Sequence, residues 1–547
     1  MKKVMIVGLD GATFDVIKPL VAAGKLPNLA YMMQNGAWGP LQSAVPPITP
    51  TAWTSIFTGK NPGKYGIYDF KVFNSQTYQT RTLRINEHRE KSLWHILGET
   101  GKQNIILDVP FTYPPMRLEG WMLTGYGTPR LPETVFTYPK NLREQLPESL
   151  RSEVAVAVPT HPFDRSKAFL EEWREVMNGR HRLLKYLITQ RNWDFFFHVF
   201  TITDNLAHIF WTYLEPSHPN YYRPEAPEYR QAFFDGYQQC DAILGDMLEW
   251  AGPETTSFII SDHGFGSIYP RQYLYQRLHD GDFLRYLSPP YLSLVSDRFM
   301  KWAMHTYTRL PFLRELVKNS RPQHQKAVKE ILKKSNLLPS TDSVDYRRSP
   351  VLASGFGLQL WINEQGRFAT GPVLPSEKTG LIDQIISYLL SDRDETTGQL
   401  IIAKVYRGQE IYHGAAIASA PDVIIEYTNF YQPEATPGQN NPNLEGGHTP
   451  EGIFLAYGPT IHPGSIQKAE LTDLAPTILH LFGEAVPPDM DGQVLTQLFR
   501  QQYIAEHPVR YGIKPAQFST IPALTMQDYT AAEEAEVEDQ LRQLGYL

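Results

Sequence analysis

The sequence is poor in three features, and each shortage excludes a class of protein. A single cysteine, Cys240, rules out an intramolecular disulfide and a zinc site built from several thiolates. The chain has no excess of positive charge, because its net charge is −7 and its pI is near 6.2, and this argues against a general nucleic-acid binder. No apolar run is long enough to cross a bilayer. Because lone thiols suit a reducing compartment, we expect a cytoplasmic protein.

The composition is that of a soluble globular chain. Of its 547 residues, 42% are hydrophobic and 20% are charged. This length allows one large domain with insertions, or about two to four domains. The apolar run Val4–Leu9 is too short for a signal peptide and is expected to form the first core strand.

Strand-like and helix-like segments alternate along the first half of the chain. The predicted strands are Val4–Leu9, Asn104–Asp108, Asp194–Phe200 and Ser257–Ser261. The predicted helices are 20–36, 93–100, 169–190 and 229–251, and the proline-rich residues 110–165 are expected to form loops. This alternation predicts an α/β sheet whose ligands gather at the carboxyl ends of its strands.

The stretch Val45–Phe70 combines prolines, hydroxyl side chains and an apolar helical run. Thr49 precedes Pro50, so we expect Thr49 to cap a helix whose first residue is proline. A hydroxyl at that place faces the first-turn N–H groups, which favour an anion such as phosphate. The alternative is an ordinary capping threonine.

Other residues of this stretch could also meet a phosphate. Thr51, Thr54 and Ser55 are reserve hydroxyls, each otherwise a polar residue of the helix surface or first turn. Lys60 and Lys64 could contact phosphate, although solvated surface lysines are the simpler interpretation. The glycine spacing of 59–65 is too short for a P-loop, and no Ser or Thr follows the second lysine.

Four short motifs carry side chains of the kinds that bind metals. They are GLDGAT with Asp10, TDNLAH with Asp204 and His208, SDHG with Asp262 and His263, and GGHT with His448. The spacing of four in TDNLAH would place its Asp and His on one helical face. Carboxylates with neutral imidazoles are typical zinc ligands, and manganese is the main competitor. Three carboxylates and three imidazoles suffice for two metal ions.

The rest of the chain allows weaker predictions. Residues 301–336 are basic and are expected to form a solvated helical insertion, with a cap or a membrane-surface patch as alternatives. A loop at 433–446 should lead to His448, and the acidic tail 527–540 should form a surface helix. His198 and Cys240 are expected in the core.

The order of these motifs resembles the alkaline phosphatase superfamily, and within it the type I phosphodiesterase/nucleotide pyrophosphatase branch with its phosphohydrolase- and phosphomutase-like relatives. The resemblance rests on Asp10, Thr49 with Thr58-Gly59, the Asp204/His208 pair, Asp262-His263 and His448, and on the late segment 472–492. It implies an α/β/α sandwich with a largely parallel central sheet and a helical insertion. It also implies a catalytic domain at 1–275 and 345–500, a basic insertion or cap at 276–344, and a C-terminal extension at 501–547.

The resemblance also assigns roles to individual residues. It implies one metal site made of Asp10, Asp262 and His263 with Thr49, and a second made of Asp204, His208 and His448. Thr49 would attack phosphorus, and metal-activated water would hydrolyse the phospho-threonine. Nucleotide pyrophosphatases of the family carry a phosphate-holding asparagine where Phe70 stands here.

The sequence therefore predicts a hydrolase of small phosphate esters that uses two zinc ions or, alternatively, manganese. A diester or a nucleotide pyrophosphate is favoured over a monoester as its substrate. A phosphotransferase or phosphomutase would share every motif, because only the acceptor differs. A catalytically silent binding protein is the alternative from another class. A sulfatase is disfavoured because a threonine occupies the nucleophile position.

Overall fold

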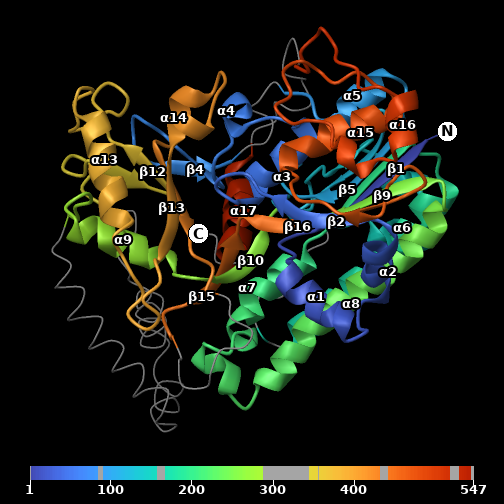
Figure 1. The fold of residues 1–547 in the computed structure, drawn as a ribbon, viewed down its shortest axis with the longest axis horizontal. Helices are drawn as coiled ribbons and strands as arrows, with labels where there is room; N and C mark the ends of the chain where they lie inside the picture. The colour runs from blue at the N-terminus through green and yellow to red at the C-terminus, as the bar shows by residue number, and fades with distance from the viewer. Residues whose placement is uncertain are drawn as a thin grey trace. The chain divides into compact units, whose positions relative to one another are not determined.

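A computed structural model describes residues 2–83, 90–156, 165, 167–287, 344–354, 357–430, 441–517 and 529–543 (Figure 1). The chain divides into two compact units. The first comprises residues 1–73, 80–270 and 390–547, and the second comprises 74–79 and 271–389. The predicted basic segment 301–336 lies outside the described residues, so its helical character stays a prediction.

The first unit is built on a nine-stranded sheet of order β17-β2-β16-β9-β1-β8-β5-β6-β7. Its strands are β1 (Lys3–Leu9), β2 (Ala37–Gln42), β5 (Asn104–Val109), β6 (Gly120–Thr124), β7 (Thr137–Tyr138), β8 (Phe195–Phe200), β9 (Thr255–Ile260), β16 (Glu451–Tyr457) and β17 (Gly464–Ser465). The five neighbouring strands from β9 to β6 run parallel. Antiparallel pairs occur where β16 joins β9 and β2 and where β7 joins β6. The predicted largely parallel sheet is confirmed.

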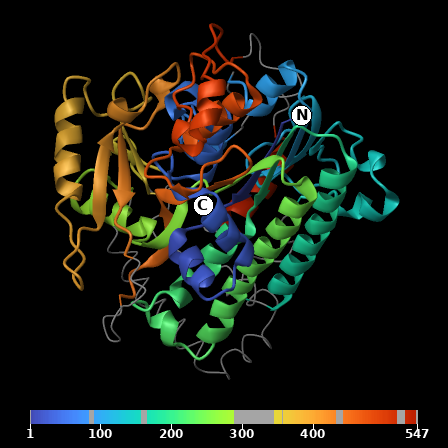
Figure 2. The same cartoon turned by 45° about the vertical axis from the view of Figure 1, so that its right-hand side comes forward.

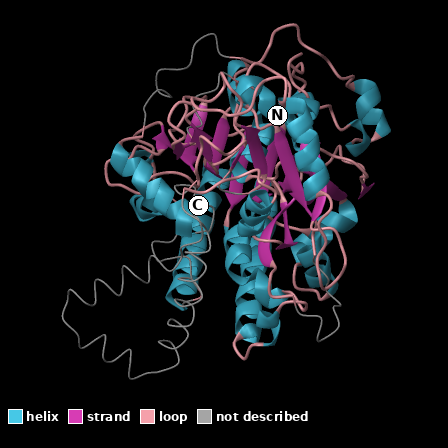
Figure 3. Cartoon of the chain, turned by 90° about the vertical axis from the view of Figure 1, so that its left-hand side faces the viewer, coloured by secondary structure: helices cyan, strands magenta, loops and turns pink. Residues whose placement is uncertain are grey.

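Helices cover both faces of this sheet (Figures 2 and 3). One face shares a core with α1 (Phe14–Ala22), α2 (Pro27–Asn35), α6 (Lys167–Gln190), α7 (Ile202–Leu214) and α8 (Ala226–Ala251). A second group, α3 (Thr49–Thr58), α5 (Leu93–Glu99) and α15 (Leu474–Phe482), packs together on the opposite face. The predicted α/β/α sandwich is therefore confirmed.

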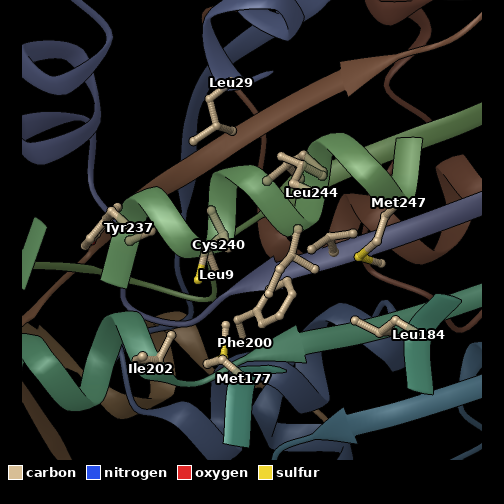
Figure 4. Close-up of a cluster of buried hydrophobic side chains, with 14 of the residues drawn as sticks. Leu9, Leu29, Met177, Leu184, Phe200, Ile202, Tyr237, Cys240, Leu244 and Met247 are labelled. Carbon is tan, nitrogen blue, oxygen red and sulfur yellow. The ribbon is translucent and has the colours of Figure 1, made fainter. Parts of the chain in front are cut away.

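The composition of β8 explains why helices pack on both faces of the sheet. Every residue of β8 is buried, and its aromatic side chains alternate between the faces. Phe200 joins Leu9 in the core beneath α6 and α8 (Figure 4). On the opposite face, the centroids of the Phe197 ring and of the Trp53 ring on α3 lie 5.9 Å apart. Cys240 is a small buried member of that core, as predicted.

The prediction of one continuous helix over 20–36 is wrong, because α1 ends at Ala22 and α2 begins at Pro27. Gly24 lies between the two helices with a φ of +69°, a conformation that favours glycine. The carboxylate of Asp241 on α8 then accepts the N–H of Leu29 at 2.8 Å and caps the new helix. The loops predicted for 110–165 are also only partly right, because β6 and β7 form there.

Smaller elements complete the first unit. They are the antiparallel pairs β3 (Lys71–Phe73) with β4 (Thr80–Thr82), β10 (Gly264–Ile268) with β15 (Glu445–Thr449) and β13 (Ile402–Arg407) with β14 (Val423–Tyr427), and the helices α4 (Pro62–Tyr65), α14 (Gly408–Ile411), α16 (Gln501–Glu506) and α17 (Ala531–Gln543).

The second unit contains α9 (Arg271–Asp280), α13 (Lys378–Leu389) and the antiparallel pair β11 (Val351–Ala353) and β12 (Gln359–Ile362). Tyr78 anchors the short segment 74–79 to the rest of this unit. The Tyr78 ring stacks on Tyr346 with centroids 4.5 Å apart, and its hydroxyl donates to Asn363 Oδ1 at 3.0 Å.

The acidic tail forms the predicted helix, α17, but one face of it is buried. Val537 and Leu541 are fully covered. Glu536 pairs with Arg130 at 2.8 Å, and Glu533 accepts the hydroxyl of Tyr113 at 2.7 Å. The helix thus docks on the loops that follow β5 and β6, at the carboxyl edge of the sheet.

Lys60 lies just beyond the C-terminal end of α3 and is fully buried. Its ammonium group contacts Glu90, Asp489 at 2.5 Å and the carbonyl of Ala516 at 2.9 Å. The prediction of a solvated lysine is therefore wrong. Lys64 pairs with Asp491 at 2.6 Å, so both ammonium groups are engaged by carboxylates.

Replacing Lys60 by methionine should lower the free energy of unfolding by about 3–5 kcal/mol, because it leaves buried carboxylate charge without its partner. Urea denaturation followed by circular dichroism measures the effect. Lys64→Met is the matched control, since its pair is partly exposed and should cost about 1 kcal/mol. Equal losses in the two variants would contradict the structural role of Lys60.

Candidate metal centre

Three adjacent parallel strands position five of the six predicted carboxylate and imidazole ligands. Asp10 follows β1 directly, and Asp262 and His263 follow β9. Asp204 and His208 lie on α7, which begins two residues after β8. Because β1 lies between β8 and β9, the carboxyl ends of all three strands meet at one edge.

The sixth of these ligands, His448, comes from a part of the chain far from the other five. His448 lies on β15, which pairs antiparallel with β10 so that His448 stands opposite Phe265. Since β10 follows directly after His263, this hairpin brings residue 448 to the edge where β9 ends. Gly446 permits the approach, because a Cβ atom there would lie 2.7 Å from the Cβ of Trp211 on α7.

Asp10, Asp262 and His263 form the first ligand group, and all three are buried. His263 Nε2 lies 3.3 Å from Asp262 Oδ2 and 3.7 Å from Asp10 Oδ1. Among the described residues, these two oxygens, Asp262 Oδ2 and Asp10 Oδ1, have no hydrogen-bond partner. Buried acceptors of this kind are costly unless a cation or donor meets them, so the pair is suited to a metal ion.

Asp204, His208 and His448 form the second group. Asp204 Oδ1 lies 3.4 Å from the Nε2 atom of each histidine, and the two Nε2 atoms are 3.1 Å apart. The helical spacing of four places Asp204 and His208 on one face of α7, as predicted.

The two groups adjoin each other. The rings of His263 and His448 stack with centroids 3.6 Å apart and planes at 20°. In addition, the Nδ1 atom of His263 lies 3.0 Å from the carbonyl of Gly264, and that of His448 lies 2.9 Å from the carbonyl of Pro47. If Nδ1 carries the proton in both rings, both Nε2 lone pairs are directed into the site.

Thr49 is the first residue of α3 and is buried. Its Oγ1 lies 3.4 Å from His263 Nε2, so the hydroxyl adjoins the first ligand group. The predicted capping role is wrong by one residue, because Ile48 occupies the N-cap position and Pro50 lies in the first turn. The hydroxyl still lies at the helix N-terminus, where the helix dipole favours negative charge.

The reserve hydroxyls are engaged elsewhere. Thr51 donates to the carbonyl of Ile67 at 3.3 Å, and Thr54 donates to the carbonyl of Pro50 at 2.6 Å. Ser55 and the hydroxyl of Tyr65 are 2.7 Å apart. Thr51 lies in the first turn of α3, but all residues of the helix are buried, so the alternative of a helix-surface hydroxyl is wrong for Thr54 and Ser55. Thr49 is the hydroxyl of this helix that meets the ligand groups.

The pKa values of the three carboxylates are shifted in different directions. Burial and the nearby Asp262 and Asp204 charges raise the pKa of Asp10 well above its usual value. Burial and the Asp204 charge do the same to the pKa of Asp262. Burial opposes ionisation of Asp204, but the imidazoles of His208 and His448 hold its pKa well below the usual value. A cation in the first group would offset this repulsion between carboxylates.

Several contacts around the ligands were not predicted. The indole N–H of Trp53 donates to Asp10 Oδ2 at 3.1 Å. The hydroxyls of Thr203 and Ser43 donate to the main-chain carbonyls of Asp10 at 2.6 Å and Asp262 at 2.7 Å. Trp53 could have been found from its spacing, because it lies one helical turn after Thr49.

Phe70 is fully buried, and its ring lies 5.3 Å from that of Phe111. The Phe70 side chain is therefore core packing and offers no amide for a phosphoryl oxygen. The neighbouring Asp69 accepts the main-chain N–H of Phe70 at 2.6 Å. The position where the resemblance implied an asparagine thus has a different role in this chain.

The three-layer fold and its edge of carboxylates and imidazoles define the class, an alkaline phosphatase-like α/β enzyme. The chain belongs to the type I phosphodiesterase/nucleotide pyrophosphatase family, whose model matches residues 4–450. It is accordingly a hydrolase of phosphoric ester bonds from a metal-dependent family. Comparison of the sequence with curated proteins gives no significant match.

The solved structures that match this chain are distant from it in sequence. Human ectonucleotide pyrophosphatase/phosphodiesterase 5 is 13% identical, with a TM-score of 0.44 over 92% of this chain and 99% of that one. Phosphonoacetate hydrolase from Sinorhizobium meliloti 1021 is 12% identical, with a TM-score of 0.47 over 87% of this chain and 94% of that one. Within the described part of the chain, no helix has the length and apolarity of a membrane span.

Proposed function

We propose that this protein hydrolyses small phosphate esters, with diesters and nucleotide pyrophosphates preferred, through a phospho-threonine on Thr49. The observation that carries the proposal is the meeting of the Thr49 hydroxyl with two compact groups of three ligands each. A silent binding protein has no need of such a hydroxyl beside two complete ligand groups.

The ligand groups suit two divalent metal ions, with zinc preferred to manganese. Asp10, Asp262 and His263 would hold one ion, and Asp204, His208 and His448 the other. The unpartnered oxygens of Asp10 and Asp262 support this fit. When bound, such ions supply Lewis-acid polarisation and neutralise charge on a phosphoryl group.

The chemistry of the chain's own residues follows from the place of Thr49. Its Oγ1 attacks phosphorus and forms an O–P bond, while the bond to the leaving alcohol or nucleotide breaks and the leaving group takes up a proton. Water then attacks the same phosphorus, and Thr49 regains its hydroxyl. The N-terminus of α3 orients the phosphoryl group throughout, because its dipole favours negative charge.

Metal analysis of the purified protein, combined with a panel of aryl mono- and diesters and dinucleoside pyrophosphates, tests the proposal. Two bound metal ions per chain and hydrolysis of a diester or pyrophosphate are expected. Transfer of the phosphoryl group to an added alcohol in preference to water would favour the alternative, a phosphotransferase or phosphomutase. A protein that binds metal but cleaves none of the esters would contradict the proposal.

A further inference from the structure

Trp53 adjoins Asp10 of the first ligand group and is completely buried. It follows Thr49 by four residues on α3, so the two side chains share one face of the helix. The nucleophile and this indole are therefore carried by a single helical turn.

The indole donates a hydrogen bond to only one of the two carboxylate oxygens of Asp10. Its Nε1–H donates to Oδ2 at 3.1 Å. The other oxygen, Oδ1, faces His263 Nε2 at 3.7 Å and has no hydrogen-bond partner within the described residues. An indole N–H is a neutral donor without acceptor capacity, so it can hold a carboxylate oxygen without adding a positive charge beside a bound cation.

The position of the indole is fixed by a missing side chain. A Cβ atom on Gly8 of β1 would lie 2.5 Å from Trp53 Cη2 and 2.9 Å from a methyl group of Val199. A side chain at position 8 would therefore collide with the indole, and glycine leaves room for the ring beside β1. The Trp53 and Phe197 rings have centroids 5.9 Å apart. Since Trp53 is also fully buried, close packing opposes rotation of the indole away from Asp10.

We propose that Trp53 is a positioning residue that reserves Asp10 Oδ1 for the metal ion of the first group, and that α3 thereby holds nucleophile and ligand in one fixed relation. This inference rests on the proposed two-metal function. It predicts that loss of the N–H, which donates to Asp10, weakens metal binding at the first group and leaves binding at the second group unaffected.

Zinc titration of the full-length protein against a chromophoric chelator tests this inference. Trp53→Phe should bind zinc at one of its two sites about 10–100-fold more weakly than the wild type, as is usual when a partner of a metal ligand is removed. Trp193→Phe is the matched control, because Trp193 is equally buried and its N–H donates to the carbonyl of Ile188 at 3.1 Å, away from the ligands. That variant should retain both affinities.

A second substitution separates the hydrogen bond from packing. Benzothienylalanine at position 53 has the shape of tryptophan but sulfur in place of the N–H, and it should weaken the same single site. Unchanged affinity in both position-53 variants, or equal weakening of both sites, would overturn the inference. A wild-type protein that binds no zinc would instead contradict the proposed function, so the two failures are distinguishable.

Discussion

Replacing Thr49 by alanine is expected to lower kcat for an aryl phosphodiester by about 10⁴-fold or more, because removal of an enzyme nucleophile typically leaves only residual catalysis. The variant should keep both metal ions, since the six other ligand side chains are unchanged. Steady-state kinetics and metal analysis on the same preparation measure both outcomes. Loss of turnover without loss of metal is the signature of a missing nucleophile.

Two variants sharpen this test. Thr51→Ala should stay within about tenfold of wild-type activity, because its hydroxyl is bound to the carbonyl of Ile67 and lies apart from the ligands. Thr49→Ser retains a primary hydroxyl and should be partly active. Acid quenching of the wild type during turnover should reveal a phosphoryl group on the peptide that contains Thr49. Full activity of Thr49→Ala would transfer the role of nucleophile to another group.

Removal of metal with a chelator should reduce ester hydrolysis to background, a fall of about 10³-fold or more, and added zinc should restore it. The same treatment should lower the melting temperature. Asp10 and Asp262 are crowded against Asp204, and a metal ion present at about 1,000 times its Kd contributes about 4 kcal/mol of stability per site. Activity assays and differential scanning calorimetry on one sample measure both effects.

Asp204→Asn serves as the control for that experiment. It removes a ligand from the second group only, so the purified variant should lose about one equivalent of metal and respond less to the chelator. Manganese can be compared with zinc in the same assay, which decides between the two ions. Hydrolysis that is indifferent to the chelator would be incompatible with metal ions in the ligand groups.

The sequence predicted much of the sheet because its central strands are short, apolar and completely buried. The ligands were recognisable for a related reason. Asp10, Asp262 and Asp204 follow such strands, where a polar side chain must be either capped or functional, and His208 completes a helical pair. The structure brings all six ligand side chains together, while the chemical role of each stays a prediction.

Other features depend on contacts that local sequence does not encode. The burial of Lys60 could not be predicted, because its partners Glu90 and Asp489 lie far away in the chain. The burial of one face of α17 could not be predicted for the same reason, since its charge alone predicts a solvated helix. The cap of α2 by Asp241 likewise joins two distant segments. The domain boundaries and the cytoplasmic location also stay predictions.

The buried Lys60 has a consequence for how the protein is made. Lys60 and Asp489 are separated by 429 residues, which a ribosome needs about 20–90 s to add at typical speeds of synthesis. Throughout that interval, the lysine lacks one of the two carboxylates with which it pairs, although Glu90 has already been added. The contacts that fix the far end of the helix beginning with Thr49 are therefore incomplete until Asp489 has been added. A polypeptide that stops before Asp489 should accordingly hold its nucleophile loosely.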